Sequence, residues 1–360
     1  MLELFKEKYT PYKRHLSTAA FAAGFLWDSI TLTRIDLWID NLILFSYLVI
    51  AGAGIFVLNI GETGRSENRF LPWLASWAPV IIQFAFGGLF SGYMIFYTRS
   101  ASLVSSWPFL LILFWLLVGN EFFEERYRRL QFQTGIFFVT IFSFFIFYIP
   151  VILGSYGVGI FLLSGIVSLF AIRLFVFALS KKIPERVALH KRSIVGCIGG
   201  IYLAINALYF TNIIPPIPLA LKDIGIYHFA ERMSGENYAV LGEEKTWGDA
   251  FRATKEFHYR AGEPAYVYSA VFAPTKLNTT IFHRWEYFDA LRDEWIETDR
   301  VSFSIAGGRD GGYRGYSVKE NIFPSLWRVD VINTRGQLLG RVKFDATEVL
   351  APPALEAAVL

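Results

Sequence analysis

The sequence predicts a membrane α-helical bundle of about seven transmembrane helices, followed by an all-β, sandwich-like soluble domain. Residues 15–214 contain apolar segments that reach the roughly 20 residues needed to span a bilayer. From about residue 246, apolar and polar residues alternate with the period of two that is typical of half-buried β-strands. Only 18% of the 360 residues are charged, against about a quarter in an average soluble protein. We therefore expect membrane lipid to surround much of the chain.

Six segments are clear candidates for spanning helices, because each is apolar on all sides over nearly its whole length. They are residues 39–60, 71–97, 103–119, 134–153, 156–179 and 193–214. A seventh candidate, 15–33, is rich in small residues and contains Asp28, and a basic arm, residues 1–14, precedes it. The first apolar stretch lacks a clear small-x-small cleavage site, so we expect no cleaved signal peptide.

Lys and Arg are unevenly distributed between the segments that connect these helices. The N-terminal arm and the segments 61–70, 120–132 and 180–192 contain 14 of them, whereas the intervening segments contain only Arg34 and Arg99. Positive residues concentrate on the cytoplasmic side of a membrane. The N-terminus is therefore predicted to be cytoplasmic and the C-terminal domain to lie outside. The C-terminal domain is predicted to lie outside even if the first helix lies in the membrane interface and does not cross the membrane.

Three prolines within residues 215–218 predict the end of the last spanning helix and an extended exit from it. We place the domain boundary there and treat 215–245 as a connecting segment. Within it, the apolar residues Leu221, Ile224, Ile226 and Phe229 predict a short amphipathic helix over residues 219–233. Such a helix would pack under the soluble domain or lie on the outer membrane face.

Residues 246–350 are predicted to form the soluble domain. Apolar positions alternate with charged ones around Trp285, Trp327 and Phe344, and turn signals occur at 309–312 and 334–336. Six or seven short strands in about 110 residues indicate a β-sandwich of immunoglobulin-like size. Residues 351–360 are predicted to be a frayed tail.

Composition excludes several classes of function. Residues 215–360 contain 17 Lys and Arg against 20 Asp and Glu, so the soluble domain lacks the basic surface that a nucleic-acid partner requires. The single cysteine, Cys197, and five histidines without ligand spacing predict no metal site and no cofactor. The sequence also lacks a nucleophile elbow, a phosphate-binding loop and a metalloprotease motif. It therefore favours a protein without enzymatic activity.

Several strings resemble one known family. They are AGFLWDSITLTRID at 23–36, NEFFEERY at 120–127, IIPPIPLALKDIGIYH at 213–228, and the segment from HRW at 283 to RVKF at 344. Together they are similar to uncharacterised bacterial membrane proteins grouped as domain of unknown function 2914. The resemblance covers nearly the whole chain and implies a bacterial inner-membrane protein with a periplasmic domain. It implies no activity and no catalytic residues.

Two groups in the soluble domain are candidates for ligand binding. His283 and Trp285 share one side of a strand, and with Trp327 they would suit sugar or peptide recognition if they were exposed. The same alternation also fits a core position for these side chains. Arg309 lies within a glycine-rich loop, residues 307–312, and Arg314 follows it; the loop either binds an anion or only forms a hairpin turn.

Four residues of the helical half are candidates because ionisable groups in a membrane are costly and often functional. Asp28 could form an ion pair with the nearby Arg34 or a helix-end hydrogen bond that fixes packing, or it could be a proton or ligand site. Arg173 is near a helix end, where its side chain can reach the interface. Glu121 belongs to an acidic group that precedes three arginines, which fits a solvated helix end or a buried acid pair.

The leading hypothesis is a membrane-anchored sandwich domain that binds a protein or glycan of the envelope, or a small ligand. One alternative is a transporter or channel, whose polar residues should line a common cavity. Another is a membrane enzyme acting on lipid or cell-wall precursors, for which the group around Glu121 is the candidate site.

Overall fold

The computed structural model describes residues 25–32, 34–62, 70–100, 103–120, 129–233, 237–244, 252–309, 311–351 and 353–360. The chain divides into two compact units. The first comprises Met1–Thr98, Pro108–Ile149 and Val158–Phe210, and is helical in its described parts. The second comprises Arg99–Trp107, Pro150–Gly157 and Thr211–Leu360, and contains all the described strands. The prediction of helices followed by a β-rich region is therefore confirmed.

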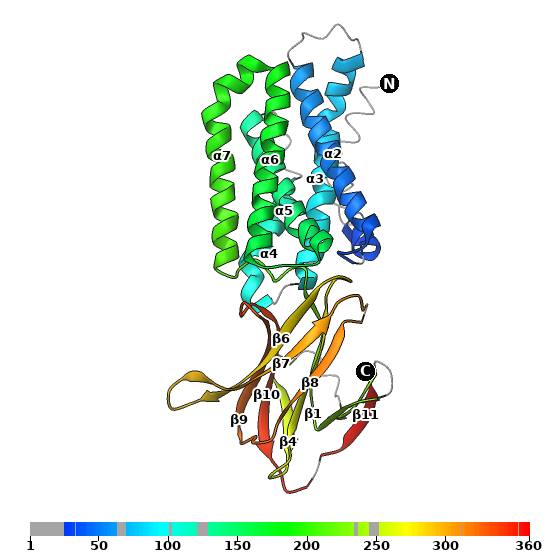
Figure 1. Cartoon of the computed structure of the whole chain (residues 1–360), viewed down its shortest axis with the longest axis vertical. Coiled ribbons are helices and arrows are strands. Elements are labelled where there is room, and N and C mark those ends of the chain that lie inside the picture. The colour runs from blue at the N-terminus through cyan, green and yellow to red at the C-terminus, as the bar shows by residue number, and fades with distance from the viewer. Residues whose placement is uncertain are drawn as a thin grey trace, which may run out of the picture. The chain divides into compact units, whose positions relative to one another are not determined.

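The helices are α2 (Trp38–Gly61), α3 (Phe70–Ser100), α4 (Leu103–Gly119), α5 (Leu130–Leu153), α6 (Val158–Lys182) and α7 (Pro184–Phe210) (Figure 1). Residues 25–31 are also helical. All of these except α4 and the short segment 25–31 are long and apolar enough to cross a membrane. The count of seven spans stays a prediction, because part of the first candidate lies outside the described residues.

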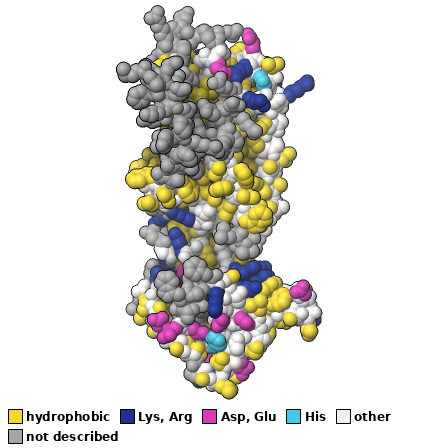
Figure 2. All heavy atoms as spheres, turned by 180° about the vertical axis from the view of Figure 1, so that it is seen from behind, with side chains coloured by type: hydrophobic (Ala, Val, Ile, Leu, Met, Phe, Trp, Pro, Cys, Tyr) yellow, Lys and Arg dark blue, Asp and Glu magenta, His cyan; other side chains and the backbone are white. Residues whose placement is uncertain are grey.

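The surface of the helical unit is apolar, as lipid contact requires. Large side chains are more than half exposed on several helices, including Trp73, Phe84, Trp115, Phe170 and Leu203. Figure 2 shows hydrophobic side chains across the coloured part of this surface, with charged side chains and His toward its ends. A water-soluble protein rarely exposes so large a contiguous apolar surface.

The second unit contains eleven strands in the described residues. They are β1 (Ala220–Tyr227), β2 (Phe229–Arg232), β3 (Tyr238–Glu243), β4 (Lys255–Tyr259), β5 (Ala265–Phe272), β6 (Asn278–Asp289), β7 (Glu294–Ala306), β8 (Tyr313–Lys319), β9 (Ser325–Asn333), β10 (Leu338–Glu348) and β11 (Leu355–Val359). They form a three-stranded sheet β1-β5-β8, a five-stranded sheet β4-β10-β9-β6-β7 and a three-stranded sheet β11-β3-β2. Among the described strands, β4 and β10 are the only parallel pair.

Strand β5 is buried on both faces, which makes its sheet the middle layer. On one face, Val267 packs in a core with Trp285 and Trp327 of the five-stranded sheet. On the other face, Tyr268 packs in a separate core with Tyr238 of the β11-β3-β2 sheet. Because neighbouring residues of a strand point to opposite faces, one strand contributes to both cores.

Three expectations for this unit were wrong. The predicted amphipathic helix over 219–233 is replaced by β1 and β2, because the period-two pair Ile224 and Ile226 aligns with β5 along an antiparallel ladder. The predicted tail contains β11, which pairs with β3. The β-rich region therefore begins before residue 246 and continues after 350, whereas the seven strands within these bounds, β4 to β10, agree with the six or seven expected.

Candidate functional site

The three aromatic candidates of the soluble domain lie in the core. His283, Trp285 and Trp327 are each 0% exposed. His283 Nε2 hydrogen-bonds Ser269 Oγ at 2.7 Å, and its Nδ1 hydrogen-bonds Ser317 Oγ at 2.8 Å. Trp285 Nε1 donates to the same Ser317 oxygen at 2.9 Å. Burial lowers the pKa of His283 to about 3, so the ring is neutral. These side chains tie β6 to β5 and β8, and they form no exposed binding face.

The two candidate arginines of the glycine-rich loop lie apart from that core. The Arg309 guanidinium carbon is 4.8 Å from the centre of the Tyr313 ring. Arg314 Nη1 donates to the carbonyl of Leu360 at 3.0 Å and to Asn237 Oδ1 at 3.4 Å. Arg314 of β8 therefore connects this strand to Leu360, next to β11, and to Asn237, next to β3. Anion binding by this loop stays a prediction.

The ionisable candidates of the helical half do not pair as predicted. Arg34 forms a bidentate pair with Asp36, with Nε–Oδ1 at 2.9 Å and Nη2–Oδ2 at 2.7 Å. The predicted ion pair between Asp28 and Arg34 is therefore wrong, because the nearer carboxylate occupies the guanidinium. Asp28 instead lies near Ser91 of α3 and Tyr47 of α2.

Arg173 is exposed on α6, which agrees with a side chain that extends toward an interface. Glu121 lies outside the described residues. Buried amides of the helical unit pair locally: Asn59 donates to Gln133 at 2.6 Å, and Asn120 donates to the carbonyl of Gln83 at 2.8 Å. In the described part of the chain, these amides form separate pairs, and the buried Asn59 Oδ1 has no hydrogen-bond partner there.

A concentration of charge lies on the outer side of the five-stranded sheet, opposite the core that contains Trp285 and Trp327. Its residues come from adjacent strands and form two rows across β6, β9 and β10, joined by an indole from β7. We call this surface the arginine face, and it consists of Arg284, Glu286, Trp295, Arg328, Asp330, Arg341 and Lys343.

The first row places one carboxylate between two guanidinium groups. Asp330 of β9 is opposite Arg284 of β6 and Arg341 of β10 in the strand register. Arg341 binds Asp330 through Nε at 2.5 Å and Nη2 at 2.8 Å, and Arg284 Nη2 binds it at 2.7 Å. The Asp330 side chain is only 1% exposed. Bidentate charged contacts of this kind are among the strongest polar interactions in proteins.

The second row reverses the order of charge. Glu286 of β6 accepts from Arg328 Nε at 2.7 Å, and Lys343 follows on β10. Trp295 of β7 stacks on the same guanidinium, with its ring centre 4.2 Å from the Arg328 carbon and 5.6 Å from Lys343 Nζ. Cations within about 6 Å of an indole face are attracted to it. The aromatic ring therefore holds two cations beside a nearly buried carboxylate.

The cations of the face keep its central carboxylate ionised. Burial would raise the pKa of Asp330, but the hydrogen bonds and charges of Arg341 and Arg284 outweigh it, so the pKa lies below its ordinary value. Both carboxylates of the two rows are thus matched by a larger number of cations. The buried Arg284 Nε has no hydrogen-bond partner among the described residues, and it lies 3.5 Å from Glu286 Oε2.

A second titratable cluster joins the edges of different sheets. Glu243 at the end of β3 accepts from His228 Nε2 at 3.2 Å, from His258 Nδ1 at 2.9 Å and from the His258 backbone N–H at 2.6 Å. The His228 ring stacks on Phe257 of β4. This carboxylate therefore connects the β11-β3-β2 sheet to the edge strand of the five-stranded sheet. In the described residues, no group of three or more potential ligands could hold a metal ion.

Comparison with known proteins identifies one family. Residues 278–346 match the family described as "Protein of unknown function (DUF2914)". The part of the chain that builds β6 to β10 is therefore similar to this family, and the expected resemblance is confirmed over this segment, which is shorter than predicted. All the residues of the arginine face lie within it. The comparison with curated proteins gives no match.

One solved structure is similar only in a weak sense. It is the alkylpurine DNA glycosylase AlkC of Pseudomonas fluorescens bound to DNA that contains an abasic site analogue. The identity is 9% over 87% of this chain and 99% of that chain, with a TM-score of 0.22. A score this low supports no argument about fold or function.

The arginine face was not predicted from the sequence, although the alternation along β9 and β10 already placed several of its residues outward. The alternation that placed Trp327 inward also placed Arg328 and Asp330 outward, and the same holds for Arg341 and Lys343. The alternation shows that a residue faces outward, but it does not show which residue lies opposite on the neighbouring strand. That requires the register. The inward aromatics drew attention because exposed aromatics on sheets often bind ligands.

Proposed function

We propose that this chain is a multi-pass protein of the bacterial inner membrane that presents a periplasmic, sandwich-type β domain. The domain binds an anionic group of an envelope protein, a glycan or a small ligand on its arginine face. The N-terminus is cytoplasmic. The chain carries out no reaction of its own in this proposal.

The membrane placement is supported by the helical unit and by charge. Five helices are long and apolar enough to cross a bilayer. The alternate connecting segments that contain 14 Lys and Arg are the ones that the positive-inside pattern assigns to the cytoplasm. The arginine face would then meet the solutes and polymers of the periplasm.

The arrangement of Arg284, Asp330 and Arg341 is the observation that carries the binding proposal. A carboxylate that is almost fully buried on the outer side of a sheet fixes two guanidinium groups in place. Together with Arg328 and Lys343 they give four cations, and the face as defined contains two carboxylates, Asp330 and Glu286. Guanidinium groups whose orientation is already fixed lose little entropy when they bind a carboxylate or phosphate.

Binding can be tested with the full chain in nanodiscs of phosphatidylcholine, a lipid without net charge. Inorganic phosphate and trigalacturonate are the anionic probes, and neutral maltotriose is their control. We expect at least one anionic probe to bind, and we expect its affinity to fall as salt rises from low to physiological concentration, because exposed charges are screened. Maltotriose should not bind.

The matched variants are Lys343→Gln and Arg292→Gln. Lys343 contributes charge to the face without an ion pair that supports the fold, whereas Arg292 is 68% exposed on the β6–β7 hairpin. Loss of one charged contact should weaken binding about tenfold for Lys343→Gln and leave it within twofold for Arg292→Gln. The proposal fails if neither anionic probe binds, or if the two variants weaken binding equally.

A further inference from the structure

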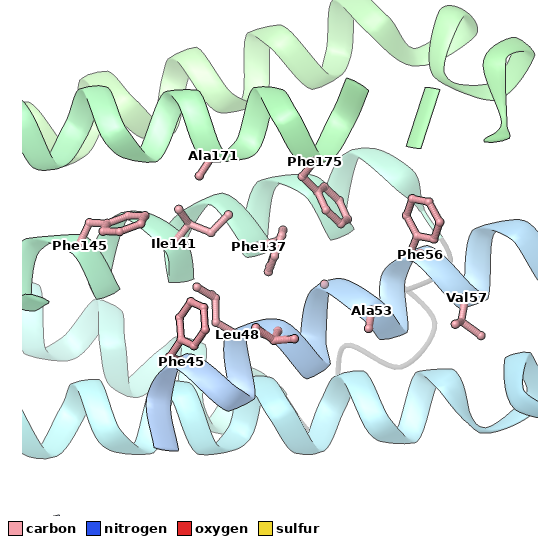
Figure 3. Close-up of a pocket in the computed structure, with 12 residues that line it drawn as sticks. Phe45, Leu48, Ala53, Phe56, Val57, Phe137, Ile141, Phe145, Ala171 and Phe175 are labelled. Carbon is pink, nitrogen blue, oxygen red and sulfur yellow. The ribbon is translucent and has the colours of Figure 1, made fainter. Parts of the chain in front are cut away.

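We infer that a cavity between α2, α5 and α6 binds the acyl chain of a membrane phospholipid. This inference rests on the membrane placement proposed above, but not on a ligand at the arginine face. The cavity has a volume of about 530 Å³ and is lined by Phe45, Leu48, Val49, Gly52, Ala53, Phe56, Val57, Phe137, Ile141, Phe145, Ala171 and Phe175. Figure 3 shows side chains of the three helices directed toward one another around it.

The cavity exists because small residues line it beside large aromatic ones. Gly52 is buried, and a Cβ at this position would lie 2.9 Å from Phe137 Cζ, so the glycine lets that ring lie against α2. Phe137 also contacts Phe175 of α6, with ring centres 4.7 Å apart. Ala53 and Ala171 leave space where longer side chains would close it. The sequence therefore keeps α2 and α6 apart at this level.

The lining identifies the occupant as hydrocarbon. Every lining side chain is apolar, and an ordered water needs two to four polar partners, so water is not retained here. An empty cavity of this size would also forfeit the dispersion contacts of its walls. Because these helices are of a length and hydropathy that cross a bilayer, acyl chains are the solvent available to fill the space.

The lining favours an acyl chain over a helix of a second copy. Phe45 and Val49 are half exposed, whereas Leu48 and Ile141 are buried. A helix is about 10 Å wide with its side chains. A single flexible chain can enter between these side chains, whereas a helix could only rest on them.

The test uses the full chain in nanodiscs that contain a phospholipid with a diazirine in the distal half of one acyl chain. After illumination, the labelled peptides are mapped by mass spectrometry. We expect labelling to concentrate in residues 45–57 and 137–145 relative to the lipid-facing surface of α7. The double variant Ala53→Leu/Ala171→Leu, which fills the cavity, should lower that labelling at least fivefold. Ala204→Leu, which adds the same side chain to the exposed surface of α7, should leave it unchanged.

Two results would overturn the inference. One is labelling of the cavity peptides that persists unchanged in the filled variant. The other is a cross-link between two copies through residues 45–57 in place of a lipid adduct, which would make the cavity a contact between copies. Carbonate extraction of membranes from cells that produce the chain separates this from the proposed function. A chain that is extracted was never in the membrane, whereas a retained chain without cavity labelling contradicts the acyl-chain site alone.

Discussion

The carboxylate of Asp330 lies against the guanidinium of Arg341, which binds both of its oxygens, at 2.5 Å and 2.8 Å. This pair is on the outer side of the five-stranded sheet, where strands usually place solvated residues. Asp330 is nevertheless buried, within a polar network on the outer side of the sheet. Trp285 and Trp327 form the apolar core on the inner side. The same contacts that fix the register of β9 and β10 also fix the proposed binding groups.

Asp330→Asn should destabilise the β domain by about 2 kcal/mol. The substitution leaves Arg284 and Arg341 without their shared carboxylate, and breaking a buried pair costs about 3–5 kcal/mol when the remaining charge stays buried. These guanidinium groups are 23–26% exposed, so hydration offsets part of that cost. Hydrogen exchange of the β9 and β10 amides in increasing urea measures the change.

Glu297→Gln is the control for that prediction. Glu297 pairs with Arg300 on the adjacent strand β7, but both side chains are well exposed. Exposed ion pairs contribute at most about 1 kcal/mol, and often nothing. Equal losses for Asp330→Asn and Glu297→Gln would contradict the role assigned to burial.

The helices could be predicted from the sequence because long apolar segments have few alternative structures. The segments 39–60, 71–97 and 134–153 correspond to α2, α3 and α5 within a few residues. Strands β6, β9 and β10 were also predictable, since apolar and polar residues alternate along much of their length. In both cases the local pattern and the tertiary environment require the same structure.

The elements that were missed depend on distant partners. Residues 219–233 have apolar residues at spacings that also suit a helix, and pairing with β5 decides in favour of strands. Residues 355–359, LEAAV, have no strong strand propensity and become β11 by pairing with β3, more than 110 residues earlier. The arginine face could not be predicted for the same reason, because the position of Asp330 between Arg284 and Arg341 follows from the register of three strands.

The buried His283 should make the β domain sensitive to mild acid. Its pKa is about 3 in the folded domain and about 6.5 in an unfolded chain, so the unfolded state binds the proton first as pH falls. The stabilisation is present above pH 6.5 and is lost between pH 6.5 and 3, on the order of 4 kcal/mol in all. Urea titrations followed by hydrogen exchange of β6 should show this dependence. His283→Gln, which does not titrate, should remove it, and an identical pH profile in the variant would contradict the prediction.

Ser317→Ala should destabilise the same core by about 2 kcal/mol. The hydroxyl of Ser317 binds both His283 Nδ1 and Trp285 Nε1, and both rings are fully buried. Removing it leaves two buried groups without this partner, at about 1–3 kcal/mol for each unsatisfied group. Ser302→Ala, at an exposed position of β7, should change stability by less than about 0.5 kcal/mol. The measurement is the urea midpoint of hydrogen exchange in β6 and β8.

Glu243→Gln should release the β2–β3 hairpin from the edge of β4. Burial would raise the pKa of Glu243, but hydrogen bonds from His228 and from the His258 backbone and ring outweigh it, so the pKa is lowered. The carboxylate therefore stabilises the native domain above its unfolded pKa of about 4.3, and this contribution is lost as pH falls through the lower folded value. At pH 7 the variant should exchange its β3 amides faster than the wild type. Below the folded pKa the two should converge, and a constant difference across this range would contradict the role of the charge.

A reporter joined to Leu360 should be active only outside the cytoplasm. The positive-inside pattern assigns residues 180–192 to the cytoplasm, and α7 then carries the chain across once before the β domain. Alkaline phosphatase fused after Leu360 or after Ser155, in the α5–α6 connection, should be active in intact cells, and a fusion after Lys182 should be inactive. Green fluorescent protein does not fluoresce when it is exported in unfolded form. It should therefore give the opposite pattern at all three positions. Fluorescence from the Leu360 fusion would place the arginine face in the cytoplasm and remove the basis for a periplasmic ligand.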